Sequence, residues 1–220
     1  MTELRHSVWL LLIVLAACTA APDEQAPPPP EPLAAPEPAL PAPPPEPDLS
    51  AQRLTIAGVG DIMLGTDYPR NILPDDDGVG FLQFVTPALQ SADVAFGNYE
   101  GTLLDGGEAA KECKNPNACY LFRSPTRYAQ LLADAGFDVI SVANNHARDF
   151  GEEGRDATMA ALDAVSIRHS GRWGSYASWE QDGLRIGMLA FSPTRGAWNL
   201  LDIDMAAWAV TGFAAKHDIV

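Results

Sequence analysis

Apolar positions divide much of the chain into short continuous runs and longer stretches with helical spacing. The continuous runs have the character of buried strands, and in each following stretch apolar residues recur every three or four positions. The predicted strands are 54–59, 93–98 and 137–143, and the predicted helices are 81–90, 125–135, 152–165 and 205–216. We therefore expect an α/β fold in which these strands share a sheet.

Turn and cap residues mark the ends of several of these elements. Ser124 precedes Pro125 and can serve as an N-cap, and Gly136 is a typical residue at a helix C-terminus. The pair Asp182-Gly183 separates two apolar runs and predicts a tight hairpin. Residues 218–220 have the pattern of the start of a strand. The chain stops there, so we expect the domain to be incomplete at its C-terminus.

The first residues have the composition of a signal peptide. Arg5 precedes an apolar run at 8–15, which is far shorter than the roughly 20 residues that a membrane-spanning helix needs. Small residues follow, and the Leu-Ala-Ala-Cys sequence at 15–18 resembles the lipobox of bacterial lipoproteins. We expect a signal peptide at 1–17 and a lipid on Cys18, and Thr19 favours the outer membrane. The alternative is an ordinary secretory signal in which Cys18 is incidental.

A stretch rich in Pro, Ala and Glu, residues 18–52, separates the signal peptide from a domain at 53–220. It holds most of the prolines of the chain and no aromatic residue. Such a segment cannot bury enough apolar surface to offset the entropy lost on ordering, so we expect a disordered, extended tether. A ligand for SH3-type domains is the alternative interpretation of these prolines.

The chain is strongly acidic, with a formal net charge of −15 at pH 7. Leaving out the six acidic residues of the tether and the neutral signal peptide gives the domain a charge of about −9, which disfavours nucleic acid as a partner. A few basic residues could face an anionic substrate, but we interpret them as solvated charges on an acidic surface. These residues are Lys111, Lys114, Arg123 and Arg127.

Some reactive residues have purely structural explanations. Cys113 and Cys119 lie close together in an exported domain, so we expect a disulfide between them. Two cysteines are too few for a Cys-only zinc site. We interpret His169 and His217 as surface residues, with His217 favourably placed near a helix C-terminus.

Polar residues with metal-binding side chains follow three successive predicted strands. Asp61 comes after the first strand, Glu100 after the second, and Asn145 with His146 after the third. Since ligands gather at the carboxyl ends of strands in α/β sheets, these groups would meet there and suit Mn²⁺, Zn²⁺ or Fe. A pair of such ions can clamp a phosphate and activate a water molecule, while His146 donates a proton to the leaving group.

Each of these residues also has a structural explanation when taken alone. Asp61 can cap a turn, Glu100 can be a solvated carboxylate, and Asn145 can occupy a left-handed turn. Their repeated placement after apolar strands favours a shared metal-binding site over three separate structural roles. Asp149 either orients the imidazole of His146 or caps the helix that follows, and both interpretations stay open.

Five segments together form a recognisable set. They are Gly-Asp-Ile-Met-Leu at 60–64, Gly-Asn-Tyr-Glu at 97–100, Phe-Arg-Ser-Pro at 122–125, Ala-Gly-Phe-Asp at 135–138 and Ala-Asn-Asn-His-Ala at 143–147. This set resembles the CapA family of bacterial capsule and poly-gamma-glutamate biosynthesis proteins. The resemblance implies a four-layer α/β/β/α sandwich similar to the metallophosphatases. The residue roles that it implies are Asp61, Glu100 and Asn145 as ligands of two divalent ions, His146 as the catalytic residue, and Asn144 and Asp149 as supporting residues.

The sequence departs from that family towards its end. Family members continue into a strand that ends in His-Trp-Gly and into a later segment similar to Gly-His-x-His, and neither is present here.

Two hypotheses follow from the resemblance and the departure. The first is a lipid-anchored protein of the cell envelope, at the outer membrane or facing the periplasm, with a metal-dependent phosphoesterase-like site that acts in synthesis or export of a capsule polymer. The second is a non-catalytic assembly protein that binds metal, anionic polymer or other proteins of the capsule machinery.

Overall fold

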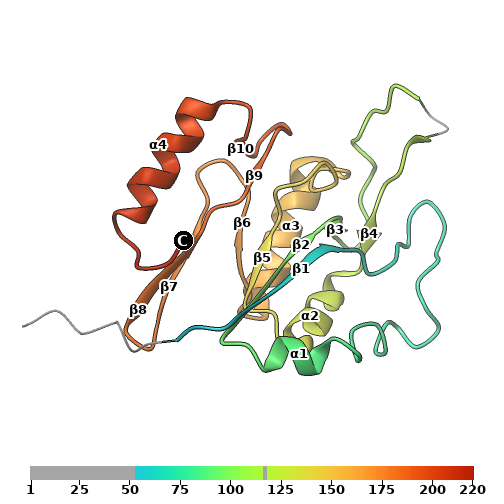
Figure 1. Ribbon diagram of the computed structural model, residues 1–220. Coiled ribbons are helices and arrows are strands. Elements are labelled where there is room, and N and C mark those ends of the chain that lie inside the picture. Colours follow the sequence, from blue (N-terminus) through green and yellow to red (C-terminus); the bar gives the residue numbers. More distant parts are fainter. Residues whose placement is uncertain (1–52, 116–117) are drawn as a thin grey trace, which may run out of the picture. The chain divides into compact units, whose positions relative to one another are not determined.

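A four-stranded parallel sheet forms the centre of the domain in the computed structural model, which describes residues 53–115 and 118–220 (Figure 1). The strands, in spatial order, are β1 (Ile56–Ile62), β2 (Val94–Tyr99), β5 (Val139–Ser141) and β6 (Arg168–Ser170). All three pairings are parallel. The three predicted strands are confirmed, with shifted ends. The predicted signal peptide, Cys18 and the tether lie outside the described residues.

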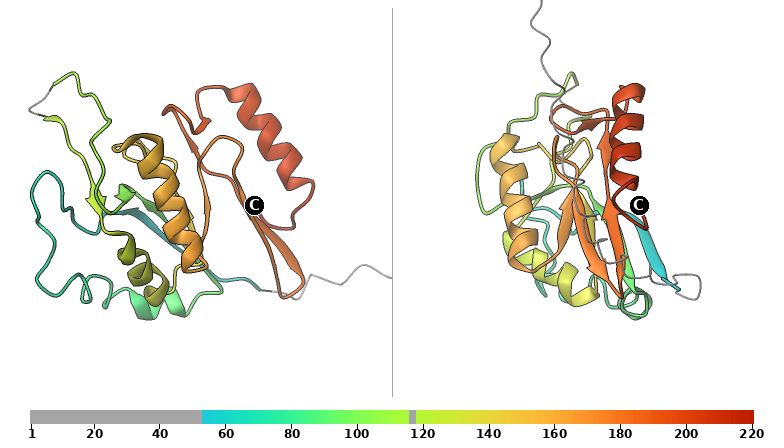
Figure 2. Two further views of the ribbon diagram at one scale, coloured as in Figure 1. Left: turned by 180° about the vertical axis from the view of Figure 1, so that it is seen from behind. Right: turned by 90° about the vertical axis from the view of Figure 1, so that its left-hand side faces the viewer.

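Three helices cover one face of this sheet, as the edge-on view in Figure 2 shows. They are α1 (Thr86–Gln90), α2 (Ala129–Ala135) and α3 (Gly151–Ala164). Because strand residues alternate between faces, Ala95 and Ile140 point to this side, where they share the main core with Leu132 of α2 and Leu162 of α3. We call this side the helix-covered face.

The opposite face of the sheet packs against a β-hairpin. Its strands are β7 (Ala177–Gln181) and β8 (Leu184–Met188), which pair antiparallel. Val94 and Val139, each next in sequence to a residue of the main core, join Leu184 and Ile186 of β8 in a second core. We call this side the hairpin-covered face. Asp182 and Gly183 both have positive φ, as a type I′ turn requires, so the predicted hairpin is confirmed.

Helix α4 (Ile203–Ala214) forms the outermost layer beyond the hairpin. Its Phe213 packs over Gly187 of β8 so closely that a Cβ at Gly187 would clash with the ring. Gly187 neighbours Ile186 in the strand and therefore faces away from the parallel sheet. The order helices, parallel sheet, hairpin, helix is the predicted α/β/β/α arrangement, and the α/β fold class is confirmed.

Two short parallel pairs and one 3₁₀ helix order the loops. The pairs are β3 (Thr102–Leu103) with β4 (Arg123–Ser124), and β9 (Phe191–Ser192) with β10 (Trp198–Asn199); the 3₁₀ helix is η3 (Thr126–Tyr128). Pairing of β3 with β4 closes the long loop after β2 at its base. That loop therefore leaves and returns next to the carboxyl ends of the strands.

Strand β1 contains a bulge just before its end. Gly58 pairs with Phe96, but the next pair is Asp61 with Asn98, so β1 uses one more residue than β2 between these points. Val59 and Ile62 can therefore both pack on the helix-covered face, while Asp61 lies beside Asn98. Bulges typically redirect a side chain in this way. The sequence pattern predicted a strand that ends at Val59, and the structure carries it on through the bulge.

Two helix predictions need correction. In the predicted helix at 81–90, residues up to Val85 form hydrogen-bonded turns, and only α1 is helical. Pro87 lies in the first turn of α1, where proline favours the start of a helix. Ser124 does not cap a helix, because its hydroxyl donates to the carbonyl of Gly65 at 3.0 Å. Gly136 ends α2 with a φ of +98°, as predicted.

The final residues lie alongside β8, with backbone hydrogen bonds between Ile219 and Gly187 and between Asp218 and Arg185. Ile219 forms an isolated parallel bridge with Ile186 of β8. Residues 218–220 are thus aligned with the hairpin without forming a full strand. None of the helices in the described ranges has both the length and the apolar character needed to cross a bilayer.

Candidate active site

The predicted site residues lie at the carboxyl ends of β1, β2 and β5, where α/β sheets place their ligands. Asp61 belongs to the end of β1, and Glu100 follows β2 directly. The amide of Glu100 donates to the carbonyl of Ile62 at 3.1 Å, which extends the pairing of the two strands by one residue. Both carboxylates are therefore fixed to the same edge of the sheet.

Asn98 connects the three strand ends, and the sequence analysis did not single it out. Its side-chain amide donates to Oδ1 of Asp61 at 2.7 Å. Its carbonyl oxygen accepts from the hydroxyl of Ser141 at 3.2 Å and from the amide of Asn144 at 3.1 Å. The available signal was its position two residues before Glu100, because a polar residue on a strand that is mostly buried requires partners.

The carboxyl groups of Asp61 and Glu100 share a hydrogen bond. This bond, with burial and the negative charge of Asp61, raises the pKa of Glu100. The hydrogen bond from Asn98 and then that from Glu100 lower the pKa of Asp61. Two like charges at one place oppose each other's ionisation, so the pair retains one proton more readily than two separate carboxyls would.

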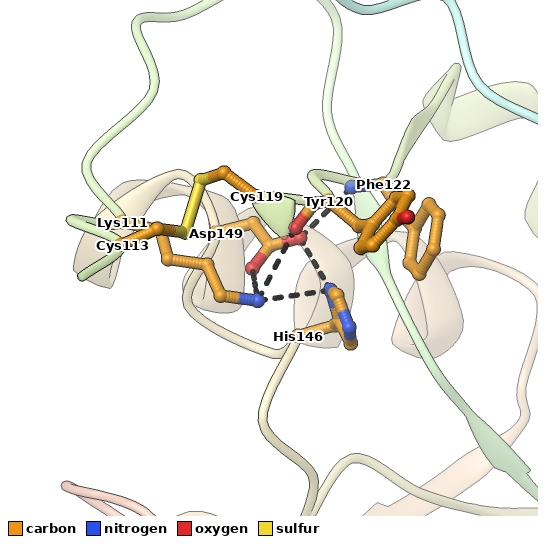
Figure 3. The surroundings of a disulfide bond; sticks show 7 residues. All are labelled: Lys111, Cys113, Cys119, Tyr120, Phe122, His146 and Asp149. Atoms are coloured by element: carbon orange, nitrogen blue, oxygen red, sulfur yellow. Dashed lines mark hydrogen bonds and ion pairs between the residues drawn. A yellow bond between two sulfur atoms is a disulfide. The ribbon is translucent and has the colours of Figure 1, made fainter. Parts of the chain in front are cut away.

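His146 is the third predicted group at this edge. Its ring is buried, and its Nε2 lies 3.8 Å from Oε1 of Glu100. Its Nδ1 lies 2.7 Å from Oδ2 of Asp149, and the ring of Phe122 covers it at 4.4 Å between centroids (Figure 3). The bond to Asp149 assigns the proton to Nδ1 when the ring is neutral, which leaves Nε2 free to accept a proton on the side of Glu100.

Asp149 orients His146 and does not cap helix α3. The residue before α3 is Phe150, and no side chain caps that helix end. The carboxylate of Asp149 is fully buried, accepts from the backbone amide of Phe122 at 2.8 Å, and pairs with Nζ of Lys111 at 2.9 Å (Figure 3). A buried carboxylate with these partners is held in one position, so the imidazole is held as well.

Lys111 belongs to the site, so its interpretation as a solvated charge was wrong. Its Nζ lies 3.2 Å from Nδ1 of His146, in addition to its ion pair with Asp149 (Figure 3). Cys113 and Cys119 form a disulfide in the same loop, with their Cα atoms 5.5 Å apart. The backbone amide of Lys111 also donates to the carbonyl of Asp149 at 3.0 Å. The loop after β2 is therefore tied to the residues that orient the imidazole.

Asn144 and Asn145 have different environments. Asn144 is buried; its amide donates to the carbonyl of Tyr99 at 2.8 Å, and its side-chain oxygen accepts from the backbone amide of His146 at 2.9 Å. Asn145 is exposed and lines a cavity together with Lys111. Among the described residues, no hydrogen bond joins Asn145 to the pair Asp61–Glu100. The hydrogen bonds of Asn144 order the loop that carries His146, and the roles of Asn144 in the site and of Asn145 as a metal ligand both stay predictions.

The donor set suits a divalent cation but is small. Within the described ranges, no three His, Cys, Asp or Glu side chains meet in a geometry that could hold a metal ion. Asp61 and Glu100 nevertheless form a pair of carboxylates whose mutual repulsion a cation would relieve, and carboxylate and amide oxygens are ligands for hard ions. The residues present therefore fit part of a metal site.

Two other basic residues and two other histidines have local partners. Arg123 pairs with Asp67 at 2.6 Å and is only partly exposed, whereas Arg127 forms a surface pair with Asp77. His169 lies 3.1 Å from Asp163. His217 is half-buried, with Nδ1 2.8 Å from the carbonyl of Phe213 near the end of α4, so it is not simply a surface residue. None of these contacts involves Asp61, Glu100 or His146.

Comparison with known proteins identifies the family. Residues 55–216 match the family described as bacterial capsule synthesis protein PGA_cap. The chain is 25% identical over 147 residues to the capsule biosynthesis protein CapA of Bacillus anthracis, an alignment that covers 64% of this chain and 35% of that protein. It is 28% identical over 172 residues to the PGA biosynthesis protein CapA of Bacillus subtilis strain 168, covering 75% of this chain and 40% of that protein.

A third relative comes from a different bacterium. The chain is 32% identical over 121 residues to the uncharacterized protein y4sH of Sinorhizobium fredii, which covers 53% of this chain and 24% of that protein. The chain thus spans less than half the length of each of these relatives. Because the family match extends over most of the residues, the chain belongs to the bacterial capsule synthesis protein family PGA_cap.

Proposed function

We propose that this protein acts in the synthesis or export of a capsule polymer and hydrolyses a phosphate ester or a related bond. The observation that carries the proposal is the meeting of Asp61, Glu100 and His146 at one edge of the sheet, with Asp149 behind the imidazole. The family match, and the capsule-related names of two relatives, support the cellular role.

Divalent ions, two of them and of the Mn, Zn or Fe type, complete the proposed site. Asp61 and Glu100 would hold them with Asn145, and when bound they supply a polarised phosphoryl oxygen and an activated water. The residues of this chain do the rest. Asn98 holds the carboxylate of Asp61 in place, and the buried carboxylate of Asp149 fixes the ring of His146.

His146 is the proposed acid and base. Since Nδ1 is engaged by Asp149, proton exchange with substrate takes place at Nε2, on the side of Glu100. The ring of Phe122 limits access of water to the imidazole.

One observation favours a second function. The described residues contain no group of three His, Cys, Asp or Glu side chains arranged for a metal ion. The second function is therefore binding of anionic polymer or other capsule proteins without catalysis. The two functions are distinguished by whether the protein hydrolyses a substrate.

The test is hydrolysis of p-nitrophenyl phosphate and bis(p-nitrophenyl) phosphate by the purified chain with Mn²⁺. Asp61→Ala and His146→Ala should each lower kcat, by about 10² to 10⁴ for the proton donor. His169→Ala is the matched control, because it removes a histidine that contacts none of the site residues. Equal rates in all four proteins would exclude the catalytic function and favour the second one.

We place the protein in the cell envelope, held by a lipid on Cys18. The support is the resemblance of residues 15–18 to a lipobox and the capsule family to which the domain belongs. Cys18→Ser should move the protein from the membrane fraction to the soluble fraction of the cell. Unchanged membrane association of the variant would refute the anchor and would leave the assignment of the catalytic residues intact.

A further inference from the structure

A cavity of about 290 Å³ lies beside the histidine of the site. Among the residues that the structure describes, four basic ones line it, namely Lys111, Arg148, Arg155 and Arg195, and no Asp or Glu does. This is a strong local concentration of positive charge in a chain whose net charge is −15. Charged side chains of one sign around a concave surface raise the local concentration of ions of the opposite sign.

The arginines of this cavity share carboxylates instead of having one each. Arg148 and Arg155 both pair with Glu152, and Arg155 also lies 3.8 Å from Asp156, which pairs with Arg172 at 2.8 Å. Among the described residues, the buried Nε atoms of Arg148 and Arg155 have no hydrogen-bond partner. Arg195 is exposed, and its side chain makes no ion pair within the described ranges. The cavity therefore retains donors and positive charge that its own residues do not use.

Arg155 shows how crowded the positive charges are. The residue is 4% exposed, and its Nη1 donates to the carbonyl of Gly196 at 3.1 Å. Burial and then the positive charge of Arg172 lower the pKa of its guanidinium, the negative charge of Asp156 raises it, and the charge of Arg148 lowers it again. A buried cation among other cations is costly, and a bound anion would offset that cost.

Uncharged groups add further donors at the same place. Gly151, the first residue of α3, lines the cavity, and no side chain caps this 14-residue helix at its N-terminus. Asn145 and Thr194 also line it. The N-terminus of a helix attracts negative charge, so the helix and the arginines favour the same kind of ligand.

We infer that this cavity, the cation-lined pocket, binds an oxyanion group of the substrate, either a phosphate or a carboxylate. The inference deepens the proposed function and rests on it for the identity of the reacting site. Lys111 connects the two, because it lines the pocket and also contacts His146 and Asp149. The substrate class is therefore an anionic chain: one charged group occupies the pocket while a neighbouring bond lies at His146.

The experiment is isothermal titration of the purified chain, in EDTA, with inorganic phosphate and separately with glutarate. Phosphate and glutarate distinguish the two sources of the oxyanion, and binding of either supports the pocket. Arg195→Gln should weaken binding about tenfold, as expected for the loss of one charge-assisted hydrogen bond. Lys216→Gln is the matched control, because Lys216 is also exposed and lines a different cavity.

The outcomes separate this inference from the proposed hydrolysis. Absence of binding by both anions, or equal affinities in Arg195→Gln and Lys216→Gln, would overturn the pocket even in an active enzyme. Anion binding that keeps its affinity in His146→Ala and is weakened in Arg195→Gln upholds it, including in a protein that hydrolyses nothing. Because the titration contains no metal, its result does not depend on whether the catalytic function is correct.

Discussion

On the helix-covered face of the parallel sheet, strand residues such as Ile140 are completely buried under α2 and α3, whereas on the hairpin-covered face Ile56 and Phe96 are 53% and 39% exposed. The less covered face also carries Asn98 and Ser141, since each alternates with an apolar residue of its strand. Asn98 hydrogen-bonds both Asp61 and Asn144, and Ser141 donates to Asn98. The comparison teaches that one face supplies most of the stability while the edge of the other positions the chemistry.

The largest expected effect tests the difference in packing. Leu162→Ala on the helix-covered face should lower the free energy of unfolding by about 2 to 5 kcal/mol, because Leu162 is fully buried and the change leaves a cavity. Phe96→Ala on the hairpin-covered face should cost only about 1 kcal/mol, since its ring is already partly in water. Urea unfolding measures both values. Equal losses would contradict the division between the faces.

The next effect concerns the loop that carries Lys111. Replacing both Cys113 and Cys119 by Ser should lower the free energy of unfolding by about 2 kcal/mol, because a short closed loop is opened. Hydrogen exchange of the Lys111 amide, which donates to the carbonyl of Asp149, should accelerate more than exchange in β7. A uniform acceleration across the domain would instead indicate a purely global effect.

A smaller loss of stability is expected at Asp149. Asp149→Asn keeps the shape but removes the charge that holds His146 and Lys111, and should cost about 1 to 2 kcal/mol. The NMR signals of the His146 ring should shift. Asp163→Asn is the matched control, because that side chain is 71% exposed and pairs with a different histidine. Equal stability losses in the two variants would show that Asp149 does not organise the site.

The smallest effect is a pH dependence from Asp61 and Glu100. A carboxyl whose pKa is raised in the folded protein stabilises the fold below its unfolded pKa, and this contribution is lost as pH rises through the folded pKa. The lowered pKa of Asp61 acts oppositely, stabilising above its unfolded pKa and losing that contribution as pH falls.

Asp61→Asn should therefore bring the pKa of Glu100 down towards its ordinary value and flatten the decline in stability above that value. Carbon NMR of the Glu100 carboxyl during a pH titration measures the change. Asp204→Asn, an exposed acid in α4, is the control. An unchanged pKa of Glu100 in Asp61→Asn would show that the two carboxyls do not interact.

Local pattern was enough to predict the strands and which residues follow them. Apolar runs located the parallel strands, and because their carboxyl ends share one edge, Asp61, Glu100 and His146 were expected there together. The structure brings Glu100 close to both of the others. These residues could be found because each stands directly after a buried segment.

The remaining parts of the site depend on contacts between distant segments. Asn98 looked like an ordinary strand residue, and its role becomes visible only when Asp61 and Asn144 are placed on either side of it. Lys111 lies in a loop without periodicity, 35 residues before His146, so no local signal connects the two. Asp149 had two local explanations, and the contact of its carboxylate with His146, together with a helix start at Phe150 that no side chain caps, decides between them.

The bulge in β1 has a practical consequence for mutational scans of this strand. Before the bulge, odd-numbered positions such as Val59 face the helices; after it, even-numbered positions such as Ile62 do. In a scan, polar substitutions should therefore be tolerated poorly at odd-numbered positions before Gly60 and at even-numbered positions after it. Uniform alternation along the strand would assign Asp61 to the wrong side of the sheet.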